Sequence, residues 1–294
     1  MADPDPAQRL ARWSLATGVA VLLLKGVAWR LTGSVALLSD ALESIVNVVA
    51  SLAMFFALRI ARLPADRNHP YGHGKAEYLS AVLEGVLIAV AAVLSIIAAW
   101  GRLMHPRALV DVGAGLGVSV FASALNGVLA WRLIAAGKKH RSPALAADGQ
   151  HILSDVVTTA GVLVGVALAR LTGWWRLDPI LACVVAVNIL WMGWKLVRRS
   201  VGALMDEVLD EDEVAHVRGI AERVASEDGA VGVKGFRLRR TGASGQCDMT
   251  LVVPGEMTVR AAHAICDRIE EALRADEPAL GVVVHVEPAP VSGT

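Results

Sequence analysis

Long runs of apolar residues recur along the first two thirds of the chain, and each is long enough to cross a lipid bilayer. A hydrocarbon core of ~30 Å needs ~20 mainly apolar residues in a helix, so the pattern predicts a six-helix transmembrane bundle over residues 1–204. The expected spans are 11–31, 35–59, 78–101, 111–134, 145–172 and 176–197. The second and fifth spans are the most polar, which predicts that they face protein or water rather than lipid.

After about Met205 the pattern becomes that of a small soluble domain, expected over residues 205–294. An amphipathic helix is predicted within 206–229, followed by strands at 231–242 and 246–255 that are separated by a glycine-rich turn. A second helix begins after Met257 with Thr258 as its N-cap, and a last strand covers 281–288. The order α-β-β-α-β predicts an α+β domain with both helices on one face of the sheet.

Lysine and arginine indicate how the spans are oriented. They concentrate in the segments that follow the second, fourth and sixth spans: Arg59, Arg62, Arg67, Lys75, Arg132, Lys138, Lys139, Arg141, Lys195, Arg198 and Arg199. The positive-inside rule therefore predicts that both termini are cytoplasmic. The N-terminal stretch does not resemble a removable signal peptide, and together with the compact loops this favours a bacterial inner membrane.

Composition agrees with a membrane protein and excludes other classes. The hydrophobic content of 55% and the mean hydropathy of +0.52 exceed what soluble domains show. The chain carries 28 basic and 28 acidic residues, and this balance predicts no nucleic-acid partner. The three cysteines are widely separated and form no CxxC, which argues against a disulfide framework.

Two pairs of polar residues lie inside spans that are otherwise fit for lipid. Glu43 and Asn47 are four residues apart in the second span, and His151 and Asp155 are four apart in the fifth. Residues i and i+4 share one face of a helix, so two facing pairs would place one nitrogen and three oxygens around a point. Four such groups are what a tetrahedral divalent cation requires.

Other interpretations of these pairs stay open at this stage. Asn47 alone is equally typical of a hydrogen bond between membrane helices, and the set as a whole could relay protons without a metal. A charged group at the centre of a membrane helix costs roughly 2.5–3.5 kcal/mol. Two matched pairs with carboxylates and a histidine are therefore hard to explain by packing, and a metal site is the favoured prediction.

Two further clusters are candidate metal sites. The segment PADRNHPYGHGKAE, between the second and third spans, contains Asp66, His69 and His73. Pro70 and Gly72 bend the chain between the two histidines, although a histidine-rich loop can also be purely structural. In the tail, the alternate residues His285 and Glu287 share one face of a strand. The sequence alone leaves these tail residues, with His263 on the preceding helix, as either a weak site or solvated polar residues.

Several of these segments resemble the cation diffusion facilitator family. The specific pieces are GSVALLSDALESIVN, HPYGHGKAEYLSA and DGQHILSDV, and the resemblance covers roughly residues 10–290. It implies a cytoplasmic ferredoxin-like domain, a homodimer formed through that domain, and the exchange of divalent cations for protons. The family's transport site falls on Glu43, Asn47, His151 and Asp155, and its loop site on Asp66, His69 and His73.

The chain departs from the zinc-transporting pattern at two places. Those relatives usually carry His or Asp and then Asp in the second span, whereas this chain has Glu43 and Asn47. In the tail, two positions that hold histidine in members with a binuclear zinc site are Lys234 and Thr250. His263, His285 and Glu287 match what remains, so the tail is expected to bind one ion weakly or to act chiefly in dimerisation.

The resemblance also implies roles at the boundary of the two parts. Lys75 and Asp206 match a charged pair that, in the family, holds the membrane and tail halves together near the dimer axis. The transported ion is expected to be zinc, because HxxxD in the fifth span resembles zinc-type members. Iron(II), manganese, cobalt, nickel and cadmium remain alternatives, since oxygen ligands suit harder ions and imidazole suits several transition metals.

The predicted function is thus divalent-cation efflux by metal/proton antiport, with the metal as substrate and no organic cofactor. An enzyme is not expected, because no HExxH, GxSxG or other nucleophile–base grouping is present. Two alternatives are an intramembrane metalloenzyme and a membrane receptor whose tail senses metal. Hydrolysis by the purified protein would favour the first, and binding without flux the second.

Overall fold

The computed structural model describes residues 6–32, 35–104, 113–173, 176–207 and 211–290 of the 294-residue chain. Side chains near several helix ends, including those of residues 35–43, lie outside this description. The chain divides into two compact units, Met1–Val201 and Gly202–Thr294. The first unit is helical, and the second contains a sheet with two helices.

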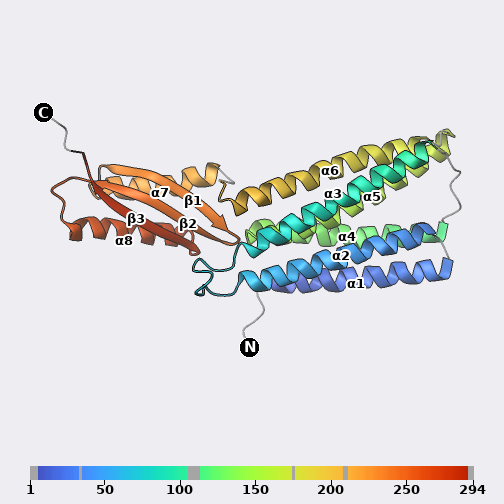
Figure 1. Ribbon diagram of the computed structural model, residues 1–294, viewed down its shortest axis with the longest axis horizontal. Helices are drawn as coiled ribbons and strands as arrows, with labels where there is room; N and C mark the ends of the chain where they lie inside the picture. Colours follow the sequence, from blue (N-terminus) through green and yellow to red (C-terminus); the bar gives the residue numbers. More distant parts are fainter. Residues whose placement is uncertain (1–5, 33–34, 105–112, 174–175, 208–210, 291–294) are drawn as a thin grey trace. The chain divides into compact units, whose positions relative to one another are not determined.

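The first unit is built from long helices that run alongside one another (Figure 1). They are α1 (Pro6–Thr32), α2 (Val35–Ala61), α3 (Ala76–Met104), α4 (Gly113–Lys139), α5 (Pro143–Thr172) and α6 (Leu177–Leu204). Five of them are long and apolar enough to cross a membrane within the described residues. The exception is α5, whose first half carries Asp148, His151 and Asp155. The predicted six-helix bundle is confirmed, and most helices extend a few residues beyond the apolar runs.

The helical unit reverses the polarity of a soluble protein. Large apolar side chains such as Leu94, Ile97 and Trp191 are about 60% exposed on the outside of the bundle. The interior holds polar residues, and those at most 9% exposed include Ser14, Asn47, Ser51, Glu84, Asn126, Asp148, His151 and Ser154. This distribution suits a bundle in lipid, where apolar surface faces the hydrocarbon and polar groups must be satisfied within the protein.

Small residues allow α5 to pack closely against α4. A Cβ added at Gly149 would lie 2.9 Å from the backbone nitrogen of Ile134, and one added at Gly137 would lie 2.7 Å from that of Ala146. These approaches leave no room for a side chain, so the backbones of the two helices are in direct contact. Close contact at small residues is a common means of packing membrane helices, and here it positions the helix that carries His151.

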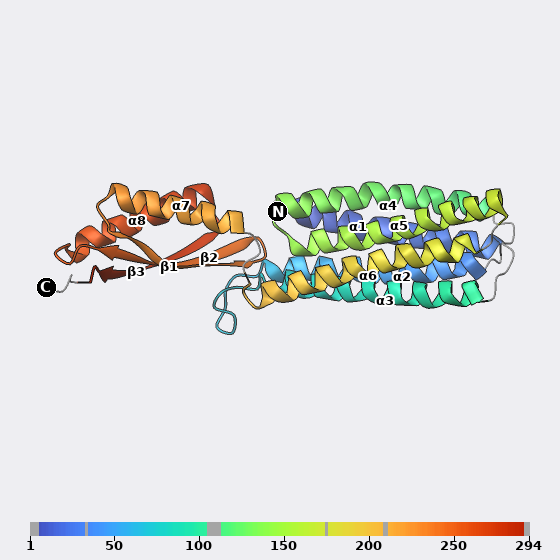
Figure 2. The same ribbon diagram turned by 90° about the horizontal axis from the view of Figure 1, so that it is seen from above.

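The second unit is a three-stranded sheet covered on one face by two helices, α7 (Glu211–Glu227) and α8 (Val259–Asp276), as Figure 2 shows. The strands are β1 (Gly232–Thr241), β2 (Ser244–Val253) and β3 (Leu280–Pro288), in the order β1-β2-β3. β1 and β2 pair antiparallel, and β2 and β3 pair parallel. The predicted order α-β-β-α-β is confirmed, and Thr258 caps α8 by accepting a hydrogen bond from the Ala261 N–H.

The core of this unit lies between the helices and the sheet. Alternate residues of β2 point into it, including Leu251 at 0% exposure, and meet Ile265, Ile269 and Leu273 of α8. At one edge the buried guanidinium of Arg240 binds both Glu277 and Glu213. This ion cluster ties β1 to the start of α7 and to the residue that ends α8.

Candidate metal centre

Three of the four predicted intramembrane ligands meet between α2 and α5. The Asn47 side-chain oxygen lies 2.8 Å from Nε2 of His151, and the Asn47 side-chain nitrogen lies 2.5 Å from Oδ2 of Asp155. His151 is 2% exposed and Asn47 is 9% exposed. The fourth residue, Glu43, belongs to α2 one turn before Asn47, but its side chain lies outside the described residues.

The hydrogen bonds define how this centre is protonated. A carboxylate only accepts, so the Asn47 NH₂ group donates to Asp155, and its carbonyl oxygen then faces His151. Nε2 of His151 must therefore carry a hydrogen and donate it to Asn47. Nδ1 of His151 is buried and has no hydrogen-bond partner among the described residues. The lone pair on Nε2 thus becomes available to a metal only when this proton moves.

Hydrogen bonds between helices hold α5 in this position. At its first turn, Ser142 accepts from the Leu145 N–H and donates to Glu77 of α3. One turn before His151, the Asp148 carboxylate accepts from Ser14 of α1 at 2.6 Å and from Ser51 of α2 at 3.1 Å. The face of α5 that carries His151 is therefore bound to α1 and α2, and the start of α5 is bound to α3.

A small cavity adjoins the centre. Its polar lining comes from Ser14, Ser44, Asn47, Ser51 and Asn126. Asn47 thus belongs both to the centre and to the wall of the cavity.

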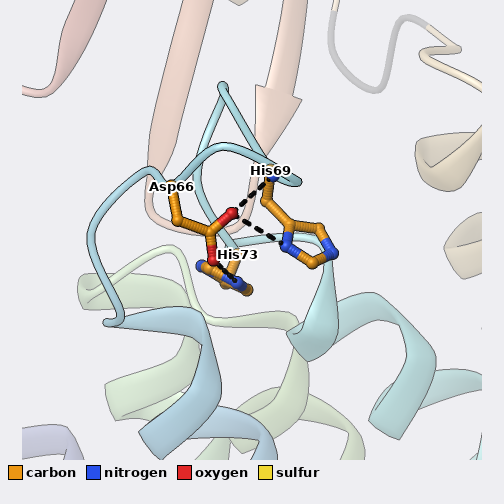
Figure 3. Close-up of side chains that lie close together, drawn as sticks. All are labelled: Asp66, His69 and His73. Carbon is orange, nitrogen blue, oxygen red and sulfur yellow. Dashed lines mark hydrogen bonds and ion pairs between the residues drawn. The ribbon is translucent and has the colours of Figure 1, made fainter.

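The second candidate site is the loop between α2 and α3. Asp66, His69 and His73 offer ligand atoms that all lie within 4.8 Å of one another, and the three side chains converge in Figure 3. The rings of His69 and His73 are 4.4 Å apart between centroids. His73 Nδ1 lies 3.3 Å from the carbonyl oxygen of Leu63, and Nε2 lies 3.5 Å from Asp66 Oδ2. A ring nitrogen that donates to a backbone carbonyl, with the other nitrogen turned to the site, is typical of metal-binding histidine.

The loop is folded by its own sequence. Asp66 Oδ1 accepts hydrogen bonds from the backbone N–H groups of His69 at 2.6 Å and Asn68 at 2.8 Å. These bonds, that of His69 above all, hold the pKa of Asp66 below its usual value, so the carboxylate stays charged. Gly72 has φ +80°, a conformation that favours glycine, and brings the chain back from His69 toward His73.

In the second unit, the structure separates the predicted tail residues. His285 Nε2 is 3.7 Å from a carboxylate oxygen of Glu287, whereas His263 is paired with Asp267 on α8 at 3.8 Å. Across the described part of the chain, the loop triad is the only group of three His, Cys, Asp or Glu residues with ligand atoms this close. His263 therefore does not complete a site with His285 and Glu287 within one chain.

Lys234 lies next to the predicted tail ligands His285 and Glu287. Lys234, Thr250 and His285 lie side by side on the three strands, and the Lys234 ammonium is 2.6 Å from Glu287. This hydrogen bond holds the pKa of Glu287 below its usual value. Asp206, one member of the predicted boundary pair, forms an ion pair within its own unit: its Oδ2 lies 3.3 Å from a guanidinium nitrogen of Arg239.

Sequence reasoning missed Asp148 and Glu84. Both are fully buried carboxyl groups in membrane helices. The signal for Asp148 was present, because it stands three residues before His151 and so shares its face of the helix. Glu84 is one acidic residue in an apolar run, and such residues inside membrane spans are functional candidates by default.

The helical bundle with buried polar centres and the attached α+β domain define an integral membrane protein of the transporter class. A family model of the cation efflux transmembrane domain matches residues 11–205, and a model of the cation efflux cytoplasmic domain, a dimerisation domain, matches 209–289. The chain belongs to the cation diffusion facilitator family of metal-cation transporters.

Two relatives support this assignment over more than nine tenths of the chain. The chain is 41% identical over 284 residues to the uncharacterized transporter sll1263 of Synechocystis sp., covering 95% of this chain and 91% of the relative. It is 33% identical to the cation-efflux pump FieF of Serratia proteamaculans, covering 92% and 89%. A solved structure of CzrB in its zinc form is 32% identical, with a TM-score of 0.28, and covers 30% of this chain and 99% of that chain.

Proposed function

We propose that the chain exports divalent cations from the cytoplasm, with zinc as the principal substrate, in exchange for protons. The single observation that carries the proposal is the contact of Asn47 with both His151 and Asp155. A neutral amide that joins an imidazole to a carboxylate provides three ligand types at one point between two membrane helices. Glu43 would be the fourth ligand, reaching the ion from one turn earlier on α2.

The ligand chemistry supports zinc and leaves related ions as alternatives. Imidazole suits zinc, iron(II), cobalt and nickel, whereas carboxylate and carbonyl oxygens also suit manganese; cadmium is a further candidate. A centre of one nitrogen and three oxygens with two carboxylates would neutralise a dication. Transport across a panel of these ions would rank them.

Antiport follows from competition between metal and protons. Metal binding requires neutral imidazole and ionised carboxylate, so protons arriving from the far side would compete with the ion and release it. Movement of α2 and α5 against the other helices would expose the centre to each side in turn. No covalent step, no organic cofactor and no enzymatic reaction is needed.

The remaining parts are assigned supporting roles. The triad of Asp66, His69 and His73 would bind a metal ion on the cytoplasmic side, with both termini in the cytoplasm of a bacterial inner membrane. The second unit would form the homodimer, with Lys75 and Asp206 near the interface. The tail would act chiefly in dimerisation, because the described residues of one chain do not bring His263 together with His285 and Glu287, and Lys234 already binds Glu287.

The decisive experiment is metal-driven proton flux in liposomes that contain the purified full-length chain. Asp155→Ala should abolish both zinc uptake and proton counter-flow, because it removes a ligand at the centre. Thr158→Ala is the matched control: it lies on the same helix and loses only a hydrogen bond to the Ser154 carbonyl. If Asp155→Ala transports like the parent chain, the site assignment is wrong.

A further inference from the structure

Glu84 is a fully buried carboxyl group for which the proposed metal centre has no use. It lies on α3 with 0% exposure, and neither of its carboxyl oxygens has a hydrogen-bond partner among the described residues. One turn earlier on the same helix, the hydroxyl of Ser80 is also buried without a partner in the described chain. Buried polar groups are normally satisfied, so this pair requires an explanation.

The helices α3 and α5 that pack together also hold a second buried carboxyl group, that of Asp148. Asp148 of α5 is close enough to Glu84 for the two charges to interact. The two helices pack together there, with Ala81 and Ile88 of α3 and Ala147 of α5 in one apolar cluster. Asp148 is itself 0% exposed, but it accepts hydrogen bonds from Ser14 and Ser51.

Two ionised carboxylates cannot both persist in such an interior, because burial and like charge both oppose ionisation. Two hydroxyl donors stabilise the charge on Asp148, whereas no described residue donates a hydrogen bond to Glu84. The proton of the pair therefore resides on Glu84.

Other charged groups do not alter this assignment. On α3 itself, Glu77 is bound by Ser142. On α5, the facing groups are Asp148 and His151. The basic residues of α6, Lys195, Arg198 and Arg199, are exposed, and the only charged residue of α2 between 44 and 61, Arg59, is exposed as well.

We propose that Glu84 is a proton carrier of the transport cycle, paired with Asp148 and separate from the metal ligands. The inference rests on the proposed antiport function. Asp148 stands one helical turn from His151, so a dication at the centre would stabilise a second negative charge on the pair. Glu84 would then release its proton to water, and it would regain a proton when the metal leaves.

The cavity beside the metal centre is bordered both by a metal ligand and by the hydrogen-bond donors of Asp148. Its wall contains Asn47 of the metal centre and also Ser14 and Ser51, which bind Asp148. Because Asn47 cannot titrate, the metal ligands supply one proton fewer than a centre with a third carboxyl group there. Glu84 would provide that missing proton.

The first test counts the protons released when zinc binds to the purified full-length chain. Calorimetry in buffers of different ionisation enthalpy gives this number. Glu84→Gln should release one proton fewer than the parent while still binding zinc at alkaline pH, and Glu84→Asp should restore the count. Glu77→Gln, which removes a buried carboxyl on the same helix that already has a Ser142 donor, should leave the count unchanged.

The second test uses only the parent chain, so it does not depend on whether a variant folds. The infrared spectrum of the zinc-free parent should contain the carbonyl band of a buried protonated carboxylic acid, and zinc addition should remove it. An unchanged proton count in Glu84→Gln, or a parent without a zinc-sensitive band, would overturn the inference. If zinc drives proton flux in the parent, either result leaves the antiport proposal intact, whereas a parent without such flux defeats that proposal itself.

Discussion

The side-chain oxygen of Asn47 lies 2.8 Å from Nε2 of His151, although 104 residues separate them in the chain. An amide oxygen only accepts, so Nε2 of His151 carries the hydrogen of this bond. Metal binding must therefore replace a hydrogen bond with a coordinate bond. The identity of the residue at position 47 thus controls both the charge of the centre and what the metal must displace.

Asn47→Asp should strengthen metal binding and make it more sensitive to pH. The new carboxylate would add a negative charge to the centre, and we expect zinc affinity at pH about 8 to rise roughly tenfold, or about 1.4 kcal/mol. Without metal, two neighbouring carboxyl groups would share a proton that zinc must expel. The affinity should therefore fall more steeply on acidification than in the parent.

Calorimetric titration of zinc at several pH values measures this effect. Asn47→Leu, which is close in size but offers no ligand, should weaken binding at every pH. Equal zinc affinity in Asn47→Asp, Asn47→Leu and the parent would show that the residue is not a ligand.

Two substitutions at Asp66 separate the fold of the loop from its charge. In Asp66→Asn the side-chain oxygen can still accept from the backbone of His69 and Asn68, so the turn should persist while the anionic ligand is lost. Asp66→Ala removes both. We expect both variants to lose metal binding at the loop, and only Asp66→Ala to show faster hydrogen exchange over residues 66–73.

Acid should weaken the loop site through its histidines rather than through Asp66. The pKa of Asp66 is held below its usual value, so this carboxylate remains ionised as the pH falls through the range where imidazoles become protonated. Cadmium bound at the loop, followed by nuclear magnetic resonance between pH 8 and about 5, should dissociate while the Asp66 carboxylate is still ionised. Dissociation that tracks carboxylate protonation instead would contradict this order.

The Lys234–Glu287 ion pair predicts that the sheet of the cytoplasmic unit needs no metal. The Lys234 ammonium binds the Glu287 carboxylate, which would otherwise be free to serve as a metal ligand. Lys234→Met should raise the pKa of Glu287 toward its ordinary value, so that Glu287 takes up its proton at a higher pH, which a carbon-13 titration of labelled glutamate can follow. Lys234→His should add a bound zinc ion per chain, whereas Lys234→Gln should not. A loss of bound zinc on His285→Ala in the parent background would contradict this prediction.

The buried ion cluster at Arg240 should be a major source of stability for the cytoplasmic unit. Arg240→Met leaves Glu277 and Glu213 without their shared cation, and breaking a buried pair in this way costs about 3–5 kcal/mol. Hydrogen exchange of β1 and α7 amides in the full-length chain should accelerate accordingly. Arg274→Ala breaks an exposed pair with Glu270 and should cost about 0.5 kcal/mol or less. Equal hydrogen-exchange rates in Arg240→Met and Arg274→Ala would show that the buried cluster stabilises the unit no more than the exposed pair does.

Much of the fold could be predicted because each element depends on local pattern. The apolar runs indicated all six membrane helices, and Thr258 marked the start of α8. The helices extend beyond the runs because helix formation does not stop at the hydrocarbon boundary: α6 continues through Lys195, Arg198 and Arg199 to Leu204. Spacing of four residues also identified the faces of α2 and α5 that meet.

What the sequence could not provide were contacts that depend on packing between distant segments. The hydrogen bonds of Asp148 could not be predicted, because its partners, Ser14 and Ser51, lie on two other helices. The pairing of Lys234 with Glu287 requires β1 and β3 to flank β2, which is a property of strand order rather than of either strand. The full burial of Glu84, and its lack of a hydrogen-bond partner among the described residues, are likewise known only from the packed structure.

The close packing of α4 on α5 makes a last prediction about the metal centre, tested at a position that touches no ligand. Gly149 lies two residues before His151, and a Cβ there would be 2.7 Å from Cγ1 and 2.9 Å from the backbone nitrogen of Ile134. Gly149→Val must therefore push α5 away from α4, at a cost of about 1–3 kcal/mol for overpacking. Displacement of α5 would separate His151 from Asn47, so zinc affinity should fall along with stability.

Gly127→Ala is the control on the same interface, because its Cβ would meet only Val156, at 4.0 Å, in ordinary contact. Calorimetric zinc titration of both variants decides the matter: unchanged affinity in a folded Gly149→Val chain would mean that the centre does not depend on how α5 sits against α4.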